Sequence, residues 1–389
     1  MTGGSEAGEA GEASSSTVRV ESLGAGQVVS LPTDRFAVEW WLARQTASGE
    51  GVPYAAGGVL DLWPARRDET AGWTFGLELE FAVADAGWVA TELHALGLCA
   101  DPEPVAYHSP RPEGLWAVEQ DRSVSTVFAS PDGGAPIVVG GEVISPPLRD
   151  TPEAWAQVAA VLDVLHRCGA EVNRNCGLHV HVGAAALRPA DGTPRDQLLA
   201  LSRLAVLANV CFEDLFFRMA SAEGGQHRGQ TVFYRHCRPL ERPLLPAYES
   251  LTALAGALGL EGSARRAALN LTNVGDPNKD TVEFRHCNGT LDGRVVQAFT
   301  RLCIALIGAA RWAPQAALLP PAPLGQHWTA RQSAAGDDAR ATVDTDSEPL
   351  WRFLSAAFPD GLSLPAAGSL YWLYRQGAWQ PALADLSLA

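Results

Sequence analysis

The chain has 389 residues, of which 47% are hydrophobic, and a formal net charge of −15 at pH 7. This length and composition suffice for one large or two medium domains with a buried core. The negative charge argues against nucleic acid as a partner, because phosphate binding relies on a basic surface. No apolar run reaches the roughly 18 residues of a membrane-spanning helix, and the first residues do not form a secretory signal. We therefore expect a cytoplasmic protein without a membrane partner.

The numbers of lysines and cysteines limit which kinds of phosphate-binding, catalytic and disulfide chemistry the chain can use. Lys279 is the only lysine, which excludes a GxxxxGK[ST] phosphate loop and a Schiff-base lysine elsewhere in the chain. Phosphate would have to be bound by arginine, histidine, a metal or backbone amides. The seven cysteines contain no CxxC pair, which favours reduced, mostly buried thiols.

Composition predicts four consecutive parts. Residues 1–30 contain mainly Gly, Ala, Glu and Ser, which predicts a disordered tail. Residues 31–70 form an N-terminal extension, residues 71–320 the main domain, and residues 321–389 a C-terminal helical region packed on the core. A Pro-rich linker, LLPPAPLG, lies near the last boundary.

In the main domain, strands alternate with helices. We expect strands at 75–81, 137–145, 177–182 and 281–287, and helices at 86–98, 152–168, 196–220, 248–258, 292–310, 348–357 and 368–376. The strands are amphipathic rather than uniformly apolar. This favours an α+β fold whose antiparallel sheet has helices on one face and a ligand on the other.

The stretch FGLELEF (75–81) carries the first chemical signal. In a strand, Glu78 and Glu80 project from one face while the apolar residues project from the other. Two carboxylates about 7 Å apart on one rigid face suit a divalent cation. A solvated strand face would give the same pattern.

The stretch GLHVHV (177–182) repeats this design with His179 and His181 on one face. Two partly buried, hydrogen-bonded histidines are the alternative. Cys176 suggests zinc, but no CxxC or HxxxH pattern completes a tetrahedral site.

Two further strands add charged residues. TVEFRHC (281–287) places Glu283 and Arg285 on one face, although a surface ion pair would also explain them. Glu142 follows two glycines, which allow another backbone or a ligand to approach closely, or it is an ordinary edge-strand acid.

Two polar residues outside these strands are also candidates. Asp121 precedes a turn, and it would do so without any chemical role. Asn270 shares a strand face with Thr272, and a cross-strand hydrogen bond would explain it equally well.

Taken together, these strands direct several carboxylates and two imidazoles to one side of a sheet. Clustered carboxylates repel and raise one another's pKa unless cations lie between them. Oxygen-rich sites with one or two imidazoles suit Mg²⁺ or Mn²⁺. An arginine beside such metals binds phosphate oxygens. The set therefore indicates phosphoryl transfer from a nucleotide.

The motif series resembles the amidoligase family, which is similar to glutamate–cysteine ligase and glutamine synthetase. The motifs are G-x-E-x-E, D-x-S, E-x-x-S-P-P, G-L-H-V-H, R-x-A-L-N and T-V-E-F-R with G-T-L-D, in this order across about residues 72–310. The resemblance implies an antiparallel sheet curved into a funnel that holds ATP and Mg²⁺ or Mn²⁺.

The resemblance also implies metal ligands. Glu78, His179 and Glu283 match the positions that hold one metal on the nucleotide phosphates. Glu80 and Glu142 match the metal site nearer the substrate carboxylate, and Glu80 is also counted among the catalytic residues.

Other residues match substrate and nucleotide positions. His181 matches a nucleotide-contacting histidine, Arg285 the arginine on the transferred phosphoryl group, and Asp121 the residue that handles the amine substrate. Arg266 and Asn270 match a substrate- or phosphate-facing strand.

Arg265 could take the role of its neighbour Arg266. The implied partners are small-molecule or peptide carboxylates and amines. A homo-oligomer is compatible with the sequence, which does not reveal the oligomeric state.

We therefore expect an ATP-dependent carboxylate–amine ligase that forms an amide through an acyl phosphate and releases ADP and phosphate. The alternatives are an amino-acid or guanidine kinase on the same scaffold, a metal-dependent hydrolase, and a catalytically inactive ligand-binding homologue.

Overall fold

A computed structural model describes most of the main domain. The described residues are 18–21, 28–31, 72–106, 109, 113–128, 137–173, 175–188, 192–205, 213–220, 249–257 and 267–312, with 350, 353, 362–363, 370 and 373–374.

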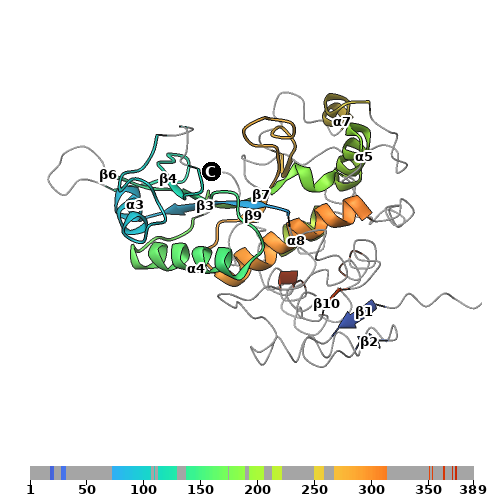
Figure 1. The fold of residues 1–389 in the computed structure, drawn as a ribbon. Coiled ribbons are helices and arrows are strands. Elements are labelled where there is room, and N and C mark those ends of the chain that lie inside the picture. Colours follow the sequence, from blue (N-terminus) through green and yellow to red (C-terminus); the bar gives the residue numbers. More distant parts are fainter. Residues whose placement is uncertain are drawn as a thin grey trace, which may run out of the picture.

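A seven-stranded antiparallel sheet forms the centre of the molecule (Figure 1). Its order is β4-β6-β3-β7-β9-β8, and β5 pairs with β6. The strands are β3 (Phe75–Ala82), β4 (Ala117–Glu119), β5 (Thr126–Phe128), β6 (Ile137–Ile144), β7 (Gly177–Gly183), β8 (Leu269–Asn270) and β9 (Thr281–Asn288). The predicted α+β class and largely antiparallel sheet are confirmed.

Within the described residues, the helices follow the predicted positions closely, whereas the helices predicted at 348–357 and 368–376 fall largely outside the described residues. They are α3 (Ala86–Ala95), α4 (Pro152–Arg167), the 3-10 helix η2 (Ala184–Leu187), α5 (Pro194–Ala205), α6 (Glu213–Met219), α7 (Leu251–Ala257) and α8 (Gly293–Trp312). α5 and α6 occupy the range predicted as one helix at 196–220. Residues 206–212 between them lie outside the described part.

Local chemistry explains where the helices begin. The Asp85 carboxylate accepts a hydrogen bond from the Trp88 amide at 2.9 Å, which caps α3. Thr151 caps α4 in the same way, and Pro152 fits the first helical turn because it has no amide hydrogen to leave unpaired.

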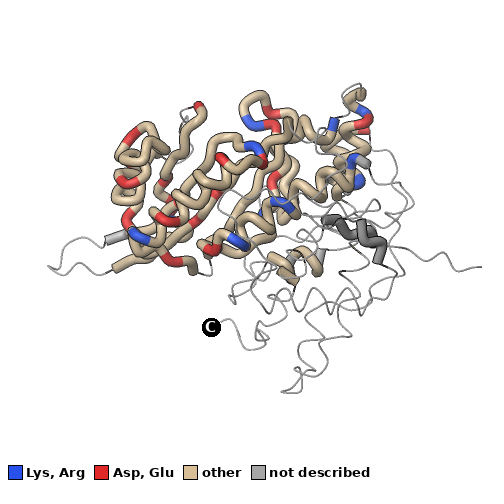
Figure 2. Tube along the Cα trace, turned by 60° about the horizontal axis from the view of Figure 1, so that its bottom comes forward, with Lys and Arg blue, Asp and Glu red and all other residues tan. Residues whose placement is uncertain are grey.

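One face of the sheet is covered by helices. Phe75, Leu77, Leu79 and Phe81 are each at most 2% exposed, as the alternation in β3 predicts. Trp155 of α4 stacks on Phe75 with a ring-centroid distance of 5.1 Å. α4 and α8 run along this face in Figure 1, and Figure 2 shows basic and acidic positions interspersed along the chain. The opposite face is left for the polar residues.

α8 passes a length-and-composition test for a membrane span over residues 293–311, contrary to the sequence-based expectation. However, 89% of that window is buried inside the protein. A core helix of a soluble protein has these properties, and cytoplasmic location remains a prediction.

Segments near both chain ends contribute structure. Strands β1 (Val18–Glu21) and β2 (Val28–Leu31) pair antiparallel, and β10 (Leu362–Ser363) pairs parallel with β1. The first two lie inside the expected disordered tail, where valine-rich stretches favour strands.

C-terminal residues join the main core. Phe353 packs edge-on against Phe216 of α6, with centroids 5.2 Å apart. The guanidinium of Arg218 donates to the Tyr374 hydroxyl at 2.8 Å. Both C-terminal side chains are at most 2% exposed.

Two glycines allow β6 to pass close to its neighbours. Gly140 has a φ of +121°, which side-chain-bearing residues rarely adopt. A Cβ atom on Gly141 would collide with the carbonyl oxygen of Glu119 in β4. The sequence predicted a close backbone approach at this pair, and the structure confirms it.

We expect Gly141→Ala to lower the free energy of unfolding by about 1–3 kcal/mol, because β4 would have to move away from β6. Urea denaturation measures this loss. Gly72→Ala is the matched control, since a Cβ there has no atom within 4 Å and its φ is ordinary. A loss below about 0.5 kcal/mol for Gly141→Ala would contradict the close packing.

Candidate functional site

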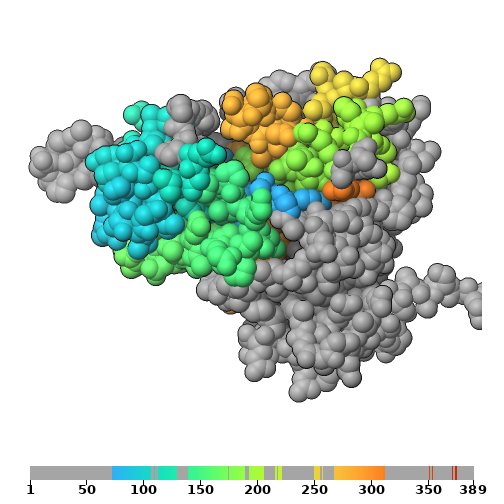
Figure 3. Space-filling view, viewed as in Figure 1, coloured from blue at the N-terminus to red at the C-terminus, as the bar shows by residue number. Residues whose placement is uncertain are grey.

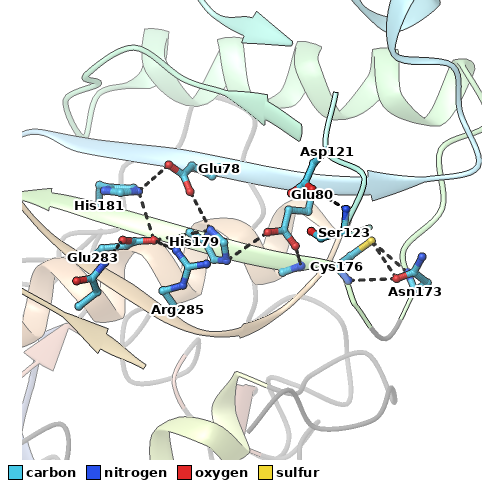
Figure 4. Close-up of polar contacts among 12 residues, drawn as sticks. Glu78, Glu80, Asp121, Ser123, Asn173, Cys176, His179, His181, Glu283 and Arg285 are labelled. Carbon is cyan, nitrogen blue, oxygen red and sulfur yellow. Dashed lines mark hydrogen bonds and ion pairs between the residues drawn. The ribbon is translucent and has the colours of Figure 1, made fainter. Parts of the chain in front are cut away.

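Strand register brings most of the predicted polar residues together on the face away from α4 and α8. Glu80 pairs with Glu142, and Glu78 with His179. On the next strands, His181 pairs with Glu283, and Glu283 pairs with Asn270. Residues from five strands therefore line one cross-strand band. Figure 4 shows its members on β3, β7 and β9.

The space-filling view shows the cyan and orange parts of the chain on the same face of the molecule (Figure 3). The side chains of the band are mostly buried, but Glu78, His181 and Arg285 retain 15%, 12% and 24% exposure. The band can therefore be reached from one side.

Glu78 lies between two imidazoles. His179 Nδ1 is 2.8 Å from Glu78 Oε2, and His181 Nε2 is 3.1 Å from Glu78 Oε1. Burial opposes ionisation of Glu78, but His181 and His179 outweigh it and hold the pKa of Glu78 well below its usual value. Burial likewise lowers the pKa of His181, but Glu78 and Glu283 more than reverse this and raise it. Glu78 is thus a carboxylate whose ionised form is stabilised by an imidazole on either side.

The second ring nitrogen of His181 has a defined partner. His181 Nδ1 lies 3.1 Å from Thr281 Oγ1 at the start of β9. A histidine that binds a metal commonly donates its other ring N–H to an outer partner. Thr281 suits this arrangement, because it leaves Nε2 free to face Glu78.

A backbone amide holds Glu80. Gly177 N donates to Glu80 Oε2 at 2.6 Å, and His179 Nε2 lies 3.5 Å from Glu80 Oε1. The turn before Gly177 is organised by Asn173, whose Oδ1 accepts from two nearby amides. Asn173 Nδ2 also donates to the Val124 carbonyl at 3.0 Å, which ties this turn to the loop after β4.

Glu283 is held at both oxygens. Asn270 Nδ2 donates to Glu283 Oε2 at 2.6 Å, and the Arg285 guanidinium donates to Oε1. Asn270 Oδ1 accepts from the amide and hydroxyl of Thr272 at 2.9 and 2.8 Å. Burial would raise the pKa of Glu283, but His181 and Arg285 outweigh this and lower it. Asn270 therefore orients Glu283, and this contact is the cross-strand hydrogen bond that the sequence allowed.

A β-bulge lies beside Arg285. The pairing of β7 with β9 shifts between Leu178 and Val180, so Arg285 and His286 together oppose His179. The His286 ring packs on the core side against aromatic rings. Arg285 projects to the polar face, as strand alternation predicts.

Glu119 is an additional buried acid that the sequence analysis did not select. It is 0% exposed and pairs with Glu142 across β4 and β6. Trp116 and Val118 of the same segment are buried in the core, so alternation in WAVE could have identified Glu119.

The pKa of Glu142 is raised well above its usual value. Burial is the largest cause, followed by the charges of Glu78, Glu80, Glu119 and Asp121. This end of the band is therefore strongly acidic.

Asp121 lies at the edge of the acidic end. Its Oδ1 accepts from the Ser123 amide at 2.7 Å, which is the turn-initiating contact that the sequence allowed. Its side chain points towards the site beside Glu80 in Figure 4. Arg266 and its alternative Arg265 lie outside the described residues.

Among the described residues, two groups of side chains have ligand atoms close enough to hold a cation. They are Glu78, Glu142 and His179, and Glu78, His181 and Glu283, with all ligand atoms of a group within 4.8 Å of one another. Both groups contain oxygens and one imidazole, a set that fits Mg²⁺ or Mn²⁺. The resemblance assigned His179 and Glu283 to one metal and His181 to the nucleotide. In the structure, the candidate cation group that contains Glu283 includes His181.

Residues 71–216 match a family model described as "putative amidoligase enzyme". The match confirms the expected family resemblance over a segment that runs from β3 to α6. It includes Glu78, Glu80, Glu142 and both histidines, but ends before Glu283. A search of curated proteins finds no match.

We expect Glu142→Gln to stabilise the metal-free protein at pH 8 and to have little effect at pH 5. The folded-state pKa of Glu142 lies above its unfolded value, so stability falls as pH rises through that interval. Removing this ionisation should raise Tm at pH 8 by about 2–4 °C.

Thermal unfolding in chelator at both pH values tests this expectation. Exposed Glu113→Gln is the matched control. A lower Tm for Glu142→Gln at pH 8 would show that the carboxylate stabilises the fold instead.

Proposed function

We infer, from the match of residues 71–216 to the amidoligase family model, that this protein is an ATP-dependent ligase joining a carboxylate to an amine. The observation that carries this proposal is the buried carboxylate–imidazole band, in which two candidate cation groups share Glu78 and lie beside Arg285. Such an arrangement can bring two anionic substrates together.

Glu78, Glu142, His179, His181 and Glu283 would hold one or two divalent cations. Bound Mg²⁺ or Mn²⁺ would offset the repulsion between the ATP phosphates and the substrate carboxylate. The chain's own part is to orient these ligands before binding: Thr281 does so for His181, and Asn270 for Glu283.

Arg285 is suited to bind the transferred phosphoryl group. Its planar guanidinium can contact two phosphate oxygens, and strand alternation directs it to the polar face together with Glu283. In the proposed first step, a substrate carboxylate oxygen attacks the γ-phosphorus of ATP and ADP leaves. The product is an acyl phosphate.

In the proposed second step, the amine nitrogen attacks the acyl carbon and inorganic phosphate leaves. The nitrogen must lose a proton, and Asp121 is placed at the acidic end of the band to hold the ammonium or accept that proton. The surrounding acids favour a cationic substrate at this end. Glu80, held by Gly177, lies between this end and the imidazoles.

Several finer features belong to the same proposal. They are a sheet curved into a glutamine synthetase-like funnel, a small-molecule or peptide carboxylate and amine as substrates, and a cytoplasmic location. Arg266 would contribute from the segment before β8.

We expect Glu283→Gln to weaken metal-dependent binding of a non-hydrolysable ATP analogue by about tenfold or more. The substitution removes the negative charge of Glu283, which is one of the three candidate cation ligands together with Glu78 and His181. Calorimetry with and without Mg²⁺ measures the effect.

Asp163→Asn is the matched control, since Asp163 is an exposed acid whose side chain is 69% accessible on α4. Unchanged analogue binding by Glu283→Gln would remove Glu283 from the nucleotide site. Circular dichroism checks that each variant is folded.

We also expect turnover with the correct acid and amine to release ADP and phosphate. A screen of acid–amine pairs by coupled ADP detection and mass spectrometry tests this. Release of AMP and pyrophosphate would indicate adenylation and overturn the acyl-phosphate route. A stable phosphorylated product without a new amide would indicate a kinase.

A further inference from the structure

The two contacts of the Glu283 carboxylate differ in charge. Asn270 is neutral and donates to Oε2, whereas Arg285 is cationic and donates to Oε1. Thr272 fixes the amide of Asn270 with its NH₂ towards Glu283. The side chain of Glu283 is only 4% exposed, so its charge needs a nearby partner.

The oxygen bound by Arg285 is the one that faces the candidate cation group. His181 Nε2 lies 3.9 Å from Glu283 Oε1 and 3.1 Å from Glu78 Oε1. A cation among these three atoms would therefore be a neighbour of the guanidinium. Two positive charges at this distance in a largely buried site repel strongly.

We propose that Arg285 is the counter-cation of the unliganded site, holding Glu283 Oε1 until a divalent cation and a polyphosphate bind together. The incoming cation then takes the oxygen, and the guanidinium turns to the phosphate, whose negative charge offsets the repulsion. The phosphate half of this inference rests on the proposed function, but the competition between Arg285 and a cation does not.

The geometry supports such an exchange. The Arg285 side chain is 24% exposed and its guanidinium has five donors, so it can re-orient without leaving the site. Asn270 is only 3% exposed and is tied to Thr272. The hydrogen bond from Asn270 to Glu283 can thus persist while a cation replaces Arg285 at the other carboxylate oxygen.

This difference gives opposite expectations for two variants that each remove one hydrogen bond from Glu283. Arg285→Met should bind Mn²⁺ alone about tenfold more tightly than the native protein, a factor typical of coupling between neighbouring sites. Asn270→Ala should bind Mn²⁺ more weakly, because Glu283 loses its orienting partner. A merely structural role for Arg285 would weaken binding in both variants.

The experiment is a titration of each protein with Mn²⁺ in the absence of nucleotide. The electron paramagnetic resonance signal of the free ion measures how much Mn²⁺ remains unbound. Arg285→Lys keeps the charge and should stay close to the native affinity. Arg167→Met, on the exposed end of α4, is the control for general loss of positive charge. Equal or weaker Mn²⁺ binding by folded Arg285→Met, or no Mn²⁺ binding by either protein, overturns the proposal.

A second titration adds a non-hydrolysable ATP analogue at saturating Mn²⁺. Arg285→Met should bind the analogue more weakly than the native protein does. The substitution would thus lower the affinity for the analogue while raising the affinity for Mn²⁺. Tighter Mn²⁺ binding by Arg285→Met with no analogue binding by the native protein would support the counter-cation role and overturn the proposed function.

Discussion

The cost of placing several carboxylates on one sheltered sheet face is the constraint that governs this molecule. Glu78, Glu80, Glu119, Glu142 and Glu283 all lie on neighbouring strands, and mutual repulsion would disfavour the fold without compensation. The two imidazoles offset the charge in the middle of the band, and Arg285 does so at one side. At the other side burial and the charges of four neighbouring acids raise the pKa of Glu142.

The site is therefore polarised across the sheet. Imidazole, guanidinium and amide groups occur on β7, β9 and β8, while β4 and β6 carry only carboxylates. An anionic group at one end of the band and a cationic group at the other would each be near side chains of opposite charge, a few strands apart.

Much of this could be predicted because a strand has a period of two. FGLELEF and GLHVHV specify which side chains share a face, and the core residues on the other face confirm the assignment. Register was not predictable, since it depends on which strands pair and on the bulge opposite His179. The pairing of His181 with Glu283 therefore could not be derived from the sequence. Glu119 is a different kind of omission, because the alternation in WAVE is sufficient to select it.

The pairing of β7 with β9 also bears on where the folding unit ends. The segment that matches the family model stops at residue 216, but β7 gains its second neighbour only from residues 281–288. A fragment ending at 216 would expose the backbone donors and acceptors of β7 along one edge, and would lose α8 from the opposite face. Other chains could add a strand to this exposed edge and cause aggregation. We therefore expect the independently folding unit to extend at least through α8.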